Sequence, residues 1–501
     1  MDGSPLNTPL EKAETGSATP PPPDIQLYKS RVKIMPMAVS GLWRRFKWQV
    51  MVVTLAIYYL TPWIRWDRGA GAPDQAVLVD LANRRFYFFF VEIWPQEFYY
   101  IAGLLIMAGI GLFLITSTVG RAWCGYFCPQ TVWTDLYLHV ERFIEGDRNK
   151  QIRLERQTWG AEKIAKRISK HSIFLLIALL TGGAWVFYFA DAPTLLMQLV
   201  TGEAPFVAYA TVGVLTFTTY ALGALMREQV CTYMCPWPRI QGAMLDEKSL
   251  TVTYHDWRGE PRGKHRKNEA ANTLGDCIDC NACVNVCPMG IDIRDGQQLE
   301  CITCALCIDA CDTMMDKMGF DRGLIAYSTL EDYAASQEDK KPRPVGLHSL
   351  FKPRSLIYFG IWSAVGIAIV ISLFLRDRLD VTVLHDRNPQ FVTLSDGSIR
   401  NGYTLKIANM RLEPRLFEVT LHGPDGEKLD GATMREAGST LAGSTQLFIS
   451  VGSDRVLERK IYIERPLDYV TSERQDIAFH VDEMTGTEQA IYDTSFNGPK
   501  R

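Results

Sequence analysis

A chain of 501 residues is long enough for several domains, and its formal charge of −3 hides local asymmetry, so net charge indicates no particular partner. All 12 cysteines lie between Cys124 and Cys311, whereas a secreted disulfide scaffold is shorter and spreads its cysteines differently. The distribution argues against such a scaffold and indicates metal binding in a reducing compartment.

The first 45 residues have the composition of a disordered tail. They contain the proline-rich stretch TPPPPDIQLYK, and they show no apolar core followed by a small-residue cleavage site. We therefore predict that residues 1–45 form a disordered cytoplasmic tail and not a signal peptide.

Five apolar runs are long enough to suggest membrane-spanning helices. They lie at residues 48–64, 98–119, 173–190, 206–226 and 355–375. A buried helix of a soluble protein is the alternative interpretation for the first and third runs. The first four runs form a predicted membrane domain over residues 46–240, and the last run is a fifth span.

The basic residues between these runs predict which side of the membrane each segment faces. Segments 120–172 and 227–354 are rich in Lys and Arg, whereas 191–205 contains neither. We therefore expect the N-terminus and both basic segments to face the cytoplasm. Five spans then place residues 376–501 on the opposite side.

Two short motifs, CGYFCP at 124–129 and CTYMCP at 231–236, each follow a pair of predicted spans and suggest an internal repeat. In an α-helix the two thiols of a motif would share one face, and the proline would end or kink the helix. Soft thiolates select Cu(I) or iron–sulfur clusters, so copper, a third cluster and simple buried packing remain open. The candidate catalytic and copper-binding thiols are Cys124, Cys128, Cys231 and Cys235.

The stretches CIDCNACVNVCP (277–288) and CITCALCIDAC (301–311) repeat one cysteine spacing within residues 241–350. In bacterial ferredoxins with this spacing, three thiolates hold one [4Fe–4S] cluster and the fourth reaches the other cluster. Zinc ribbons are the alternative but seldom use this spacing twice, and the departure at Asp312, where the pattern has proline, affects no ligand. We predict an α+β ferredoxin domain whose two [4Fe–4S] clusters relay electrons. The predicted ligands are Cys277, Cys280, Cys283 and Cys311 for one cluster, and Cys301, Cys304, Cys307 and Cys287 for the other.

Residues 380–501 alternate apolar and polar residues in about seven short runs, separated by turn signals such as DGS and GPDG. We predict an immunoglobulin-like β-sandwich that has no metal-ligand cluster. Such a domain is either a docking module for a partner or a passive cap.

The order of these features resembles that of the FixG/RdxA/CcoG polyferredoxin family. It consists of two CxxxCP motifs, the doubled stretch CPMGIDIRDGQQLECITCALCIDACD, a further span and a β-sandwich. The resemblance covers nearly the whole chain. Members are cytochrome c oxidase accessory proteins of bacterial inner membranes. The resemblance therefore implies a multi-pass inner-membrane protein with a periplasmic C-terminal domain. It also implies a role in assembly of the cbb(3)-type oxidase, through reduction of Cu(II) to Cu(I) for the oxidase copper centre.

The same resemblance implies as partners membrane lipid, a cytoplasmic electron donor, and oxidase assembly factors or a copper transporter or chaperone. We expect no nucleic-acid partner, and a homodimer stays open. Two other functions fit the residues: a quinol-linked relay subunit that feeds another membrane or periplasmic enzyme, and a non-enzymatic assembly scaffold. Because the sequence has no glycine-rich nucleotide fingerprint and no flavin motif, we expect no built-in NADH oxidation step.

Overall fold

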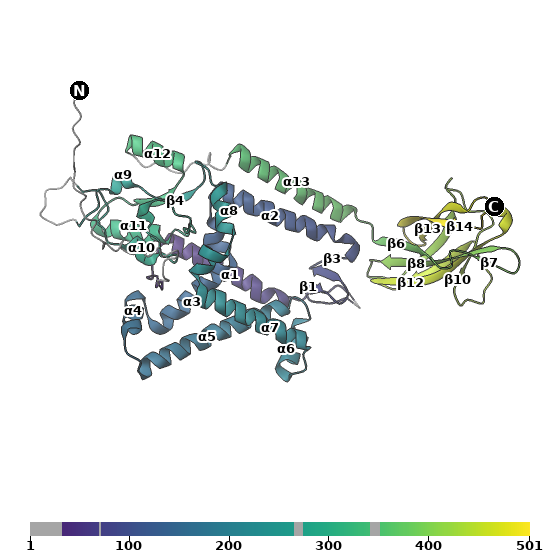
Figure 1. Ribbon diagram of the computed structural model, residues 1–501, viewed down its shortest axis with the longest axis horizontal. Coiled ribbons are helices and arrows are strands. Elements are labelled where there is room, and N and C mark those ends of the chain that lie inside the picture. The colour runs from purple at the N-terminus through teal and green to yellow at the C-terminus, as the bar shows by residue number, and fades with distance from the viewer. Residues whose placement is uncertain (1–32, 70–71, 265–273, 341–350, 501) are drawn as a thin grey trace, which may run out of the picture.

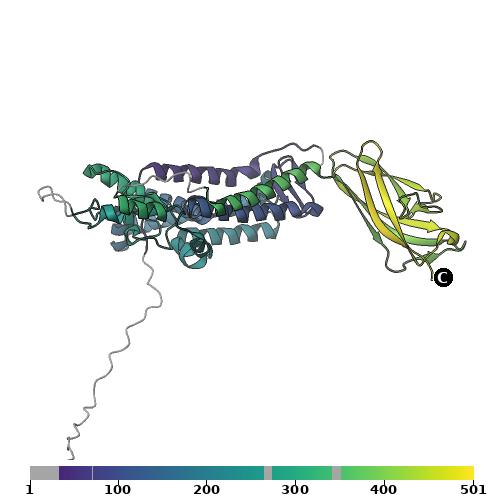
Figure 2. The same ribbon diagram turned by 90° about the horizontal axis from the view of Figure 1, so that it is seen from above.

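Figure 1 shows an elongated molecule with three parts in a row, and Figure 2 shows the same row from above. The ferredoxin segment lies at one end, long helices occupy the middle, and a β-sandwich lies at the other end. The computed structural model describes residues 33–69, 72–264, 274–340 and 351–500, so most of the predicted tail over 1–45 lies outside the described residues.

Long apolar helices form the middle part. In the described part of the chain, four regions are long and apolar enough to cross a membrane: Pro95–Val119, Ala161–Val186, Phe206–Met226 and Pro353–Leu375. They contain α2 (Tyr99–Val119), α5 (Ala161–Val186), α7 (Phe206–Thr219) and α13 (Pro353–Leu375). Most residues of these regions are not buried against the rest of the protein, which fits helices that face lipid. The regions correspond to the last four predicted runs.

The first predicted span differs from the expectation. Its helix α1 (Leu42–Leu60) begins earlier than the apolar run and carries Arg44 and Lys47, and α1 is not among the four regions above. It nevertheless starts at the ferredoxin segment, where the amide of Arg44 donates to the Asp309 carboxylate. Near its other end, the Tyr58 hydroxyl donates to the carbonyl oxygen of Thr181 in α5. The chain therefore passes along the helical layer through α1, but the described helices that are long and apolar enough to cross a membrane support four of the five predicted spans.

Shorter helices complete the middle part, namely α3 (Pro129–Glu145), α4 (Arg148–Arg156), α6 (Ala192–Thr201) and α8 (Trp237–Met244). Glu141 of α3 is buried and pairs with Lys170 of α5 at 3.1 Å and with Arg227 at 2.9 Å. Burial alone would raise the pKa of Glu141, but Arg227 and Lys170 outweigh it and lower this pKa to about 2. The ion network joins α3 and α5 to the segment that leads into the second CxxxCP motif.

A small sheet that the sequence patterns did not predict lies between the helices and the sandwich. Its strands β1 (Val77–Asp80), β2 (Arg85–Phe88) and β3 (Val91–Ile93) pair antiparallel in that order. Arg85 pairs with Glu92 at 3.2 Å and also with Asp454 of the sandwich. Burial is the largest cause that raises the pKa of Glu92 to about 7, and repulsion from Asp454 is the second. One guanidinium therefore links the small sheet to the β-sandwich.

The ferredoxin segment is a small α+β unit. Strand β4 (Thr251–Tyr254) pairs antiparallel with β5 (Ile325–Ser328). Its helices are α9 (Asp256–Gly259), α10 (Ala282–Val286), α11 (Leu306–Met318) and α12 (Leu330–Asp339). The core contains Cys277, Cys283 and Cys311 beside apolar side chains such as Ile308 and Ile325. Thiols therefore occupy places that apolar side chains fill in other small domains.

Two antiparallel sheets form the predicted immunoglobulin-like β-sandwich. One sheet has the order β10–β12–β8–β6 with β7 beside β8, and the other has the order β11–β9–β13–β14. The strands are β6 (Leu379–His385), β7 (Val392–Thr393), β8 (Ile399–Asn409), β9 (Arg415–His422), β10 (Thr433–Glu436), β11 (Gln446–Val451), β12 (Arg455–Arg465), β13 (Arg474–Glu483) and β14 (Gln489–Asn497). Every predicted run forms a strand, and β10 and β14 are additional. Phe417, Phe479 and Phe496 are fully buried in the core of this domain.

Candidate iron–sulfur and thiol sites

The two cysteine loops of the ferredoxin segment have the same backbone shape. Asp279 and Asn281 in the first loop have φ of +53° and +56°, and Thr303 and Ala305 in the second have φ of +50° and +61°. In each loop these residues stand two after the first cysteine and one after the second. Residues other than glycine rarely adopt positive φ, so the repeated strain indicates a loop shaped for a functional site.

The structure brings the eight cysteines of this segment into two adjoining groups, judged by which thiols lie within electrostatic range of one another. The first group is Cys277, Cys280, Cys283 and Cys311. The second group is Cys301, Cys304, Cys307 and Cys287. Cys307 also lies within electrostatic range of Cys283, so the groups adjoin. Among the chain's cysteines, all of which are described, only Cys280 is exposed.

Burial governs the acidity of these thiols. It is the main reason why the pKa of Cys287 rises to about 12 and that of Cys301 to about 11, and Cys304 raises both further. Such thiols ionise readily only when cations lie among them, as the iron atoms of a cluster do.

The two cysteine groups fit iron–sulfur clusters. The doubled spacing supplies four thiols to each group, and in a [4Fe–4S] cluster each thiolate binds a different iron atom. Among the described residues, no three His, Cys, Asp or Glu side chains stand close enough to hold one metal ion together.

Each CxxxCP motif lies in a π-helical turn, η3 (Trp123–Phe127) or η5 (Val230–Met234), and another such turn, η4 (Tyr220–Met226), ends α7. The amide of Cys128 donates to the carbonyl oxygen of Trp123, five residues back, and the second motif has the equivalent bond. The predicted break at each proline is confirmed, because α3 begins at Pro129 and α8 begins directly after Pro236. The prediction that each thiol pair shares one face of a regular α-helix is wrong, because these turns are π-helical and hold more residues per turn.

The backbone that leads into each CxxxCP motif has the same unusual conformation. Gly120 has φ of +61° four residues before Cys124, and Arg227 has φ of +47° four residues before Cys231. A Cβ at Gly120 would overlap the carbonyl oxygen of Leu250, so glycine is needed there for space as well as for conformation. The backbone therefore matches the predicted internal repeat, in which a long helix breaks, turns through the motif and continues as a shorter helix.

The two motifs meet, and their four thiols form one group. This thiol tetrad consists of Cys124, Cys128, Cys231 and Cys235. The Cys124 thiol donates a hydrogen bond of 3.0 Å to Oε1 of Gln241, a buried side chain of α8 that no sequence pattern singles out. Burial raises the pKa of Cys124 to about 12 and that of Cys231 to about 11, although Arg121 opposes both increases.

The thiol tetrad lies directly against the second cysteine group. A Cβ added to Gly125 would lie 2.6 Å from the carbonyl oxygen of Ile302 and 3.2 Å from the Cα of Cys304. The adjacent Tyr126 donates its hydroxyl hydrogen to the carbonyl oxygen of Cys304 at 3.1 Å. Cys124 and Cys304 belong to one buried cluster. Sequence reasoning missed Gly125 and Tyr126, although their position between the cysteines of CGYFCP could have marked them.

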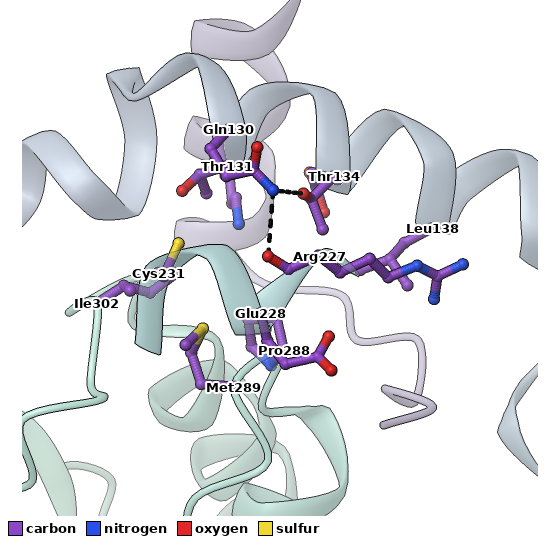
Figure 3. Close-up of a pocket in the computed structure, with 12 residues that line it drawn as sticks. Gln130, Thr131, Thr134, Leu138, Arg227, Glu228, Cys231, Pro288, Met289 and Ile302 are labelled. Carbon is purple, nitrogen blue, oxygen red and sulfur yellow. Dashed lines mark hydrogen bonds between the residues drawn. The ribbon is translucent and has the colours of Figure 1, made fainter. Parts of the chain in front are cut away.

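A cavity of about 20 Å³ lies at this junction. Figure 3 shows the side chains that line it. Cys231 lines it from η5, Gln130 from α3 and Met289 from the ferredoxin segment. The Gln130 amide donates to the carbonyl oxygen of Arg227 at 3.1 Å, which ties α3 to the start of the second motif. A cavity of this size has room for about one water-sized occupant. Two soft sulfur atoms therefore border this space, and its lining also includes the charged residues Lys47, Asp135, Arg227 and Glu228.

Span-length apolar helices, doubled cysteine loops and buried thiol groups define a membrane iron–sulfur protein with an electron-transfer role. Comparison with family models supports this class. Residues 226–330 match a "4Fe-4S dicluster domain" and residues 101–146 match a "4Fe-4S binding domain". Residues 369–499 match the "IG-like fold at C-terminal of FixG".

Curated relatives resemble the chain over nearly its whole length. Nitrogen fixation protein FixG of Rhizobium meliloti is 57% identical over 497 residues, which cover 94% of each chain. Protein RdxB of Cereibacter sphaeroides is 53% identical and covers 95% of this chain and 99% of its own. The chain therefore belongs to the FixG/RdxA family. A solved structure of a FixG-related protein from Vibrio parahaemolyticus, 19% identical with a TM-score of 0.20, covers 24% of this chain and 97% of its own.

Proposed function

We propose that this membrane iron–sulfur protein passes electrons from two [4Fe–4S] clusters to copper, and that the resulting Cu(I) serves assembly of a cbb(3)-type cytochrome c oxidase. The observation that carries the proposal is the contact between the thiol tetrad and Cys304, made through Gly125 and Tyr126. Copper at the tetrad would be the immediate neighbour of the cluster that Cys304 holds. Thiols of the membrane domain therefore stand where an electron would leave the ferredoxin segment.

In this proposal, each cysteine group of the ferredoxin segment holds one cluster. The ligands are Cys277, Cys280, Cys283 and Cys311 for the first cluster, and Cys301, Cys304, Cys307 and Cys287 for the second. The proximity of Cys307 and Cys283 supports electron transfer between the clusters. A cytoplasmic one-electron donor reduces the first cluster, and the electron continues through the second cluster toward the tetrad.

Copper is the substrate of this relay, and the thiol tetrad is its proposed site. Thiolate and thioether sulfur prefer Cu(I), and the cavity beside Cys231 also has Met289 on its wall. Each Cu(II) gains one electron, and a reduced cluster loses one. The Cu(I) product would then pass to an assembly factor, a copper transporter or a chaperone.

The sidedness of the chain is also part of the proposal. The basic segments 120–172 and 227–354 support a cytoplasmic ferredoxin segment, and the sandwich would then be periplasmic. Protease added to right-side-out and inverted inner-membrane vesicles tests this arrangement, because only right-side-out vesicles should lose the sandwich.

The test of copper reduction uses the purified protein with its clusters reduced under anaerobic conditions. Cu(II) is added, and cluster absorbance is followed together with capture of Cu(I) by a colorimetric chelator. The variants are Cys124→Ala/Cys128→Ala, which removes half of the tetrad, and Gly125→Ala, which pushes the tetrad from Cys304. Gly183→Ala is the control, since a Cβ there meets nothing within 4 Å.

We expect Cu(I) to appear as the clusters are reoxidised in the wild type and in Gly183→Ala. Both other variants should reoxidise at least tenfold more slowly while they keep their iron. Clusters that stay reduced in the presence of Cu(II), or variants that react at the wild-type rate, would show that copper is not reduced at the tetrad.

A quinol-linked relay is the second candidate, and one observation favours it. A cavity of about 490 Å³ opens between α3, α5 and the turn η4, and His171, Phe174 and Leu225 contribute to its walls. His171 Nδ1 and the Tyr220 hydroxyl share a hydrogen bond of 2.9 Å at this cavity. The apolar part of the wall and the imidazole suit a quinol ring, although six of the eleven lining residues are charged. Cluster reduction by added quinol that is lost in His171→Phe would support this candidate.

A further inference from the structure

The turn between β2 and β3 consists of two exposed aromatic residues. The strand register pairs Phe88 with Val91, so Phe89 and Phe90 alone form the loop. Phe89 has φ of +50°, and the Phe90 side chain is 77% exposed. Two-residue hairpin loops in water favour Asn and Gly, because these residues tolerate positive φ. Two exposed phenylalanines at this place therefore indicate that the turn has an apolar partner.

Contacts at two points hold the small sheet at the level where the long helices end. The amide of Val79 in β1 donates to the carbonyl oxygen of Tyr188, two residues after the end of α5. Arg376, which follows α13, donates to the carbonyl oxygen of Glu92 in β3 at 2.8 Å. The ends of helices of membrane-spanning length mark the boundary between hydrocarbon and headgroups. Since Glu92 is two residues after the aromatic turn, the turn lies beside this boundary (Figure 1).

Other exposed aromatic side chains connect this turn to the lipid-facing helices. The ring of Trp66 is exposed and packs edge-on against Phe89, with 5.6 Å between the ring centroids. Phe98 and Tyr99, at the start of α2, are also exposed. Aromatic residues gather where a membrane protein meets the headgroup region. These five residues, Trp66, Phe89, Phe90, Phe98 and Tyr99, form an aromatic rim that extends the lipid-facing surface of α2 onto the small sheet.

A cationic side chain stands beside the aromatic rim. Trp66 and Phe90 line a cavity of about 260 Å³ between the small sheet and the sandwich, which contributes Met410 and Leu412. The charged residues of its lining are Asp67, Arg68, Glu92, Arg376 and Arg378. Arg378 is exposed, and no ion pair within the described residues involves its guanidinium. Because a guanidinium matches the geometry of a phosphate group, Arg378 suits a phospholipid headgroup.

We infer that the aromatic rim docks on the phospholipid leaflet on the sandwich side of the membrane. Phe89 and Phe90 lie among the upper parts of the acyl chains, and Arg378 binds a headgroup phosphate. The ion pair between Arg85 and Asp454 then joins the sandwich to an element that rests on the bilayer. This inference does not rest on the proposed copper reduction, because it concerns other side chains at the opposite end of the helices.

The test uses the photoreactive amino acid p-benzoylphenylalanine in place of Phe90. The full-length protein is reconstituted with its clusters into vesicles that contain phosphatidylglycerol, and it is irradiated under anaerobic conditions. Benzophenone inserts into nearby C–H bonds, and mass spectrometry of the peptides distinguishes a lipid adduct from a link to protein. The matched control has the same replacement at Phe448, which is exposed on β11 of the sandwich.

The contact with phosphate is tested in the same protein by Arg378→Gln. Its control is Arg387→Gln, because Arg378 precedes β6 whereas Arg387 follows it, and both side chains are exposed. Cluster absorbance and iron content show that each variant is folded.

We expect the phospholipid adduct to be at least tenfold more abundant at position 90 than at position 448. Arg378→Gln should lower the adduct at position 90 at least threefold, and Arg387→Gln should leave it unchanged. Equal adducts at the two positions, a link from position 90 to protein in place of lipid, or an undiminished adduct in Arg378→Gln would overturn the inference.

Discussion

The ferredoxin segment and the β-sandwich form their cores in opposite ways. In the ferredoxin segment, cysteines stand among the core side chains beside Ile308 and Met315. In the sandwich, aromatic side chains such as Phe417 and Phe479 fill the core, and the domain has no cysteine. A small unit with few apolar side chains gains its stability from bound metal, whereas two packed sheets need none. We therefore expect the order of one end of the chain to depend on iron, and that of the other end on packing alone.

The largest effect should come from removing a buried thiol of the ferredoxin core. In Cys311→Ala we expect loss of the first cluster, and with it half of the bound iron and much of the order of this segment. The sandwich should keep its β-sheet circular dichroism signal, because it shares no core with the clusters. Iron analysis and circular dichroism of the purified variant measure both quantities.

Cys128→Ala is the control for this experiment. Under the copper proposal it should leave the iron content unchanged, since the thiol tetrad holds no resident cluster. A loss of iron in Cys128→Ala would contradict the copper assignment of the tetrad, and an unchanged iron content in Cys311→Ala would contradict the assignment of the first cluster.

The converse change is Phe479→Ala in the sandwich. Truncating this fully buried ring should cost about 3–5 kcal/mol of sandwich stability, because a cavity replaces the ring. Chemical denaturation followed by circular dichroism measures the loss, and cluster absorbance should not change. Phe448→Ala is the control, since the Phe448 side chain is exposed and should cost within about 0.5 kcal/mol. Loss of clusters in Phe479→Ala would show that the two ends are not independent.

In the helical layer, buried ion pairs join the helices, which distinguishes this layer from the ferredoxin segment and the sandwich. Glu141→Gln leaves the buried Arg227 without its carboxylate, whereas Lys170 keeps Glu145 at 2.7 Å. We expect a loss of about 3 kcal/mol in thermal unfolding of the detergent-solubilised protein. The control Glu162→Gln removes an exposed pair with Lys166 and should change stability by less than about 0.5 kcal/mol. Equal effects of the two variants would refute a special role for the buried network.

The smallest effect concerns the link between the small sheet and the sandwich. Burial and Asp454 raise the pKa of Glu92 from its ordinary value of 4.5 to about 7 in the folded protein. The folded state therefore binds a proton that the unfolded state has lost, and stability falls as pH rises from about 4.5 to about 7. We expect a loss of roughly 1–3 kcal/mol over this range, which Glu92→Gln should abolish. Thermal unfolding at several pH values measures it, and identical pH profiles for both proteins would disprove it.

Cysteine spacing and strand alternation were the strongest signals in the sequence, because each reflects a fixed local geometry. The doubled C-x2-C-x2-C-x3-C pattern specifies two matching loops, and the positive φ values at Asp279 and Thr303 show that the loops match in backbone shape. The alternating runs of residues 380–501 predicted strands because every second side chain enters the core.

Other features could not be predicted because they depend on contacts between distant residues or on very short elements. Strands β1 to β3 have three or four residues each, too few for a periodic pattern to stand out. A π-helical turn differs from an α-helical turn by one residue, and CGYFCP does not encode that difference visibly. The ion pair between Arg85 and Asp454 joins two distant parts of the sequence, and only the folded chain brings them together.

The exposure of Cys280 has a consequence for how long the protein survives in air. The electron relay is shielded from solvent except at one end, because Cys280 is exposed whereas Cys304 and Cys124 are buried. A donor protein can approach the relay at this exposed end. Under the proposed ligand assignment dioxygen reaches iron first at Cys280, so aerobic damage should follow a fixed order that begins with this cluster and ends beside the thiol tetrad.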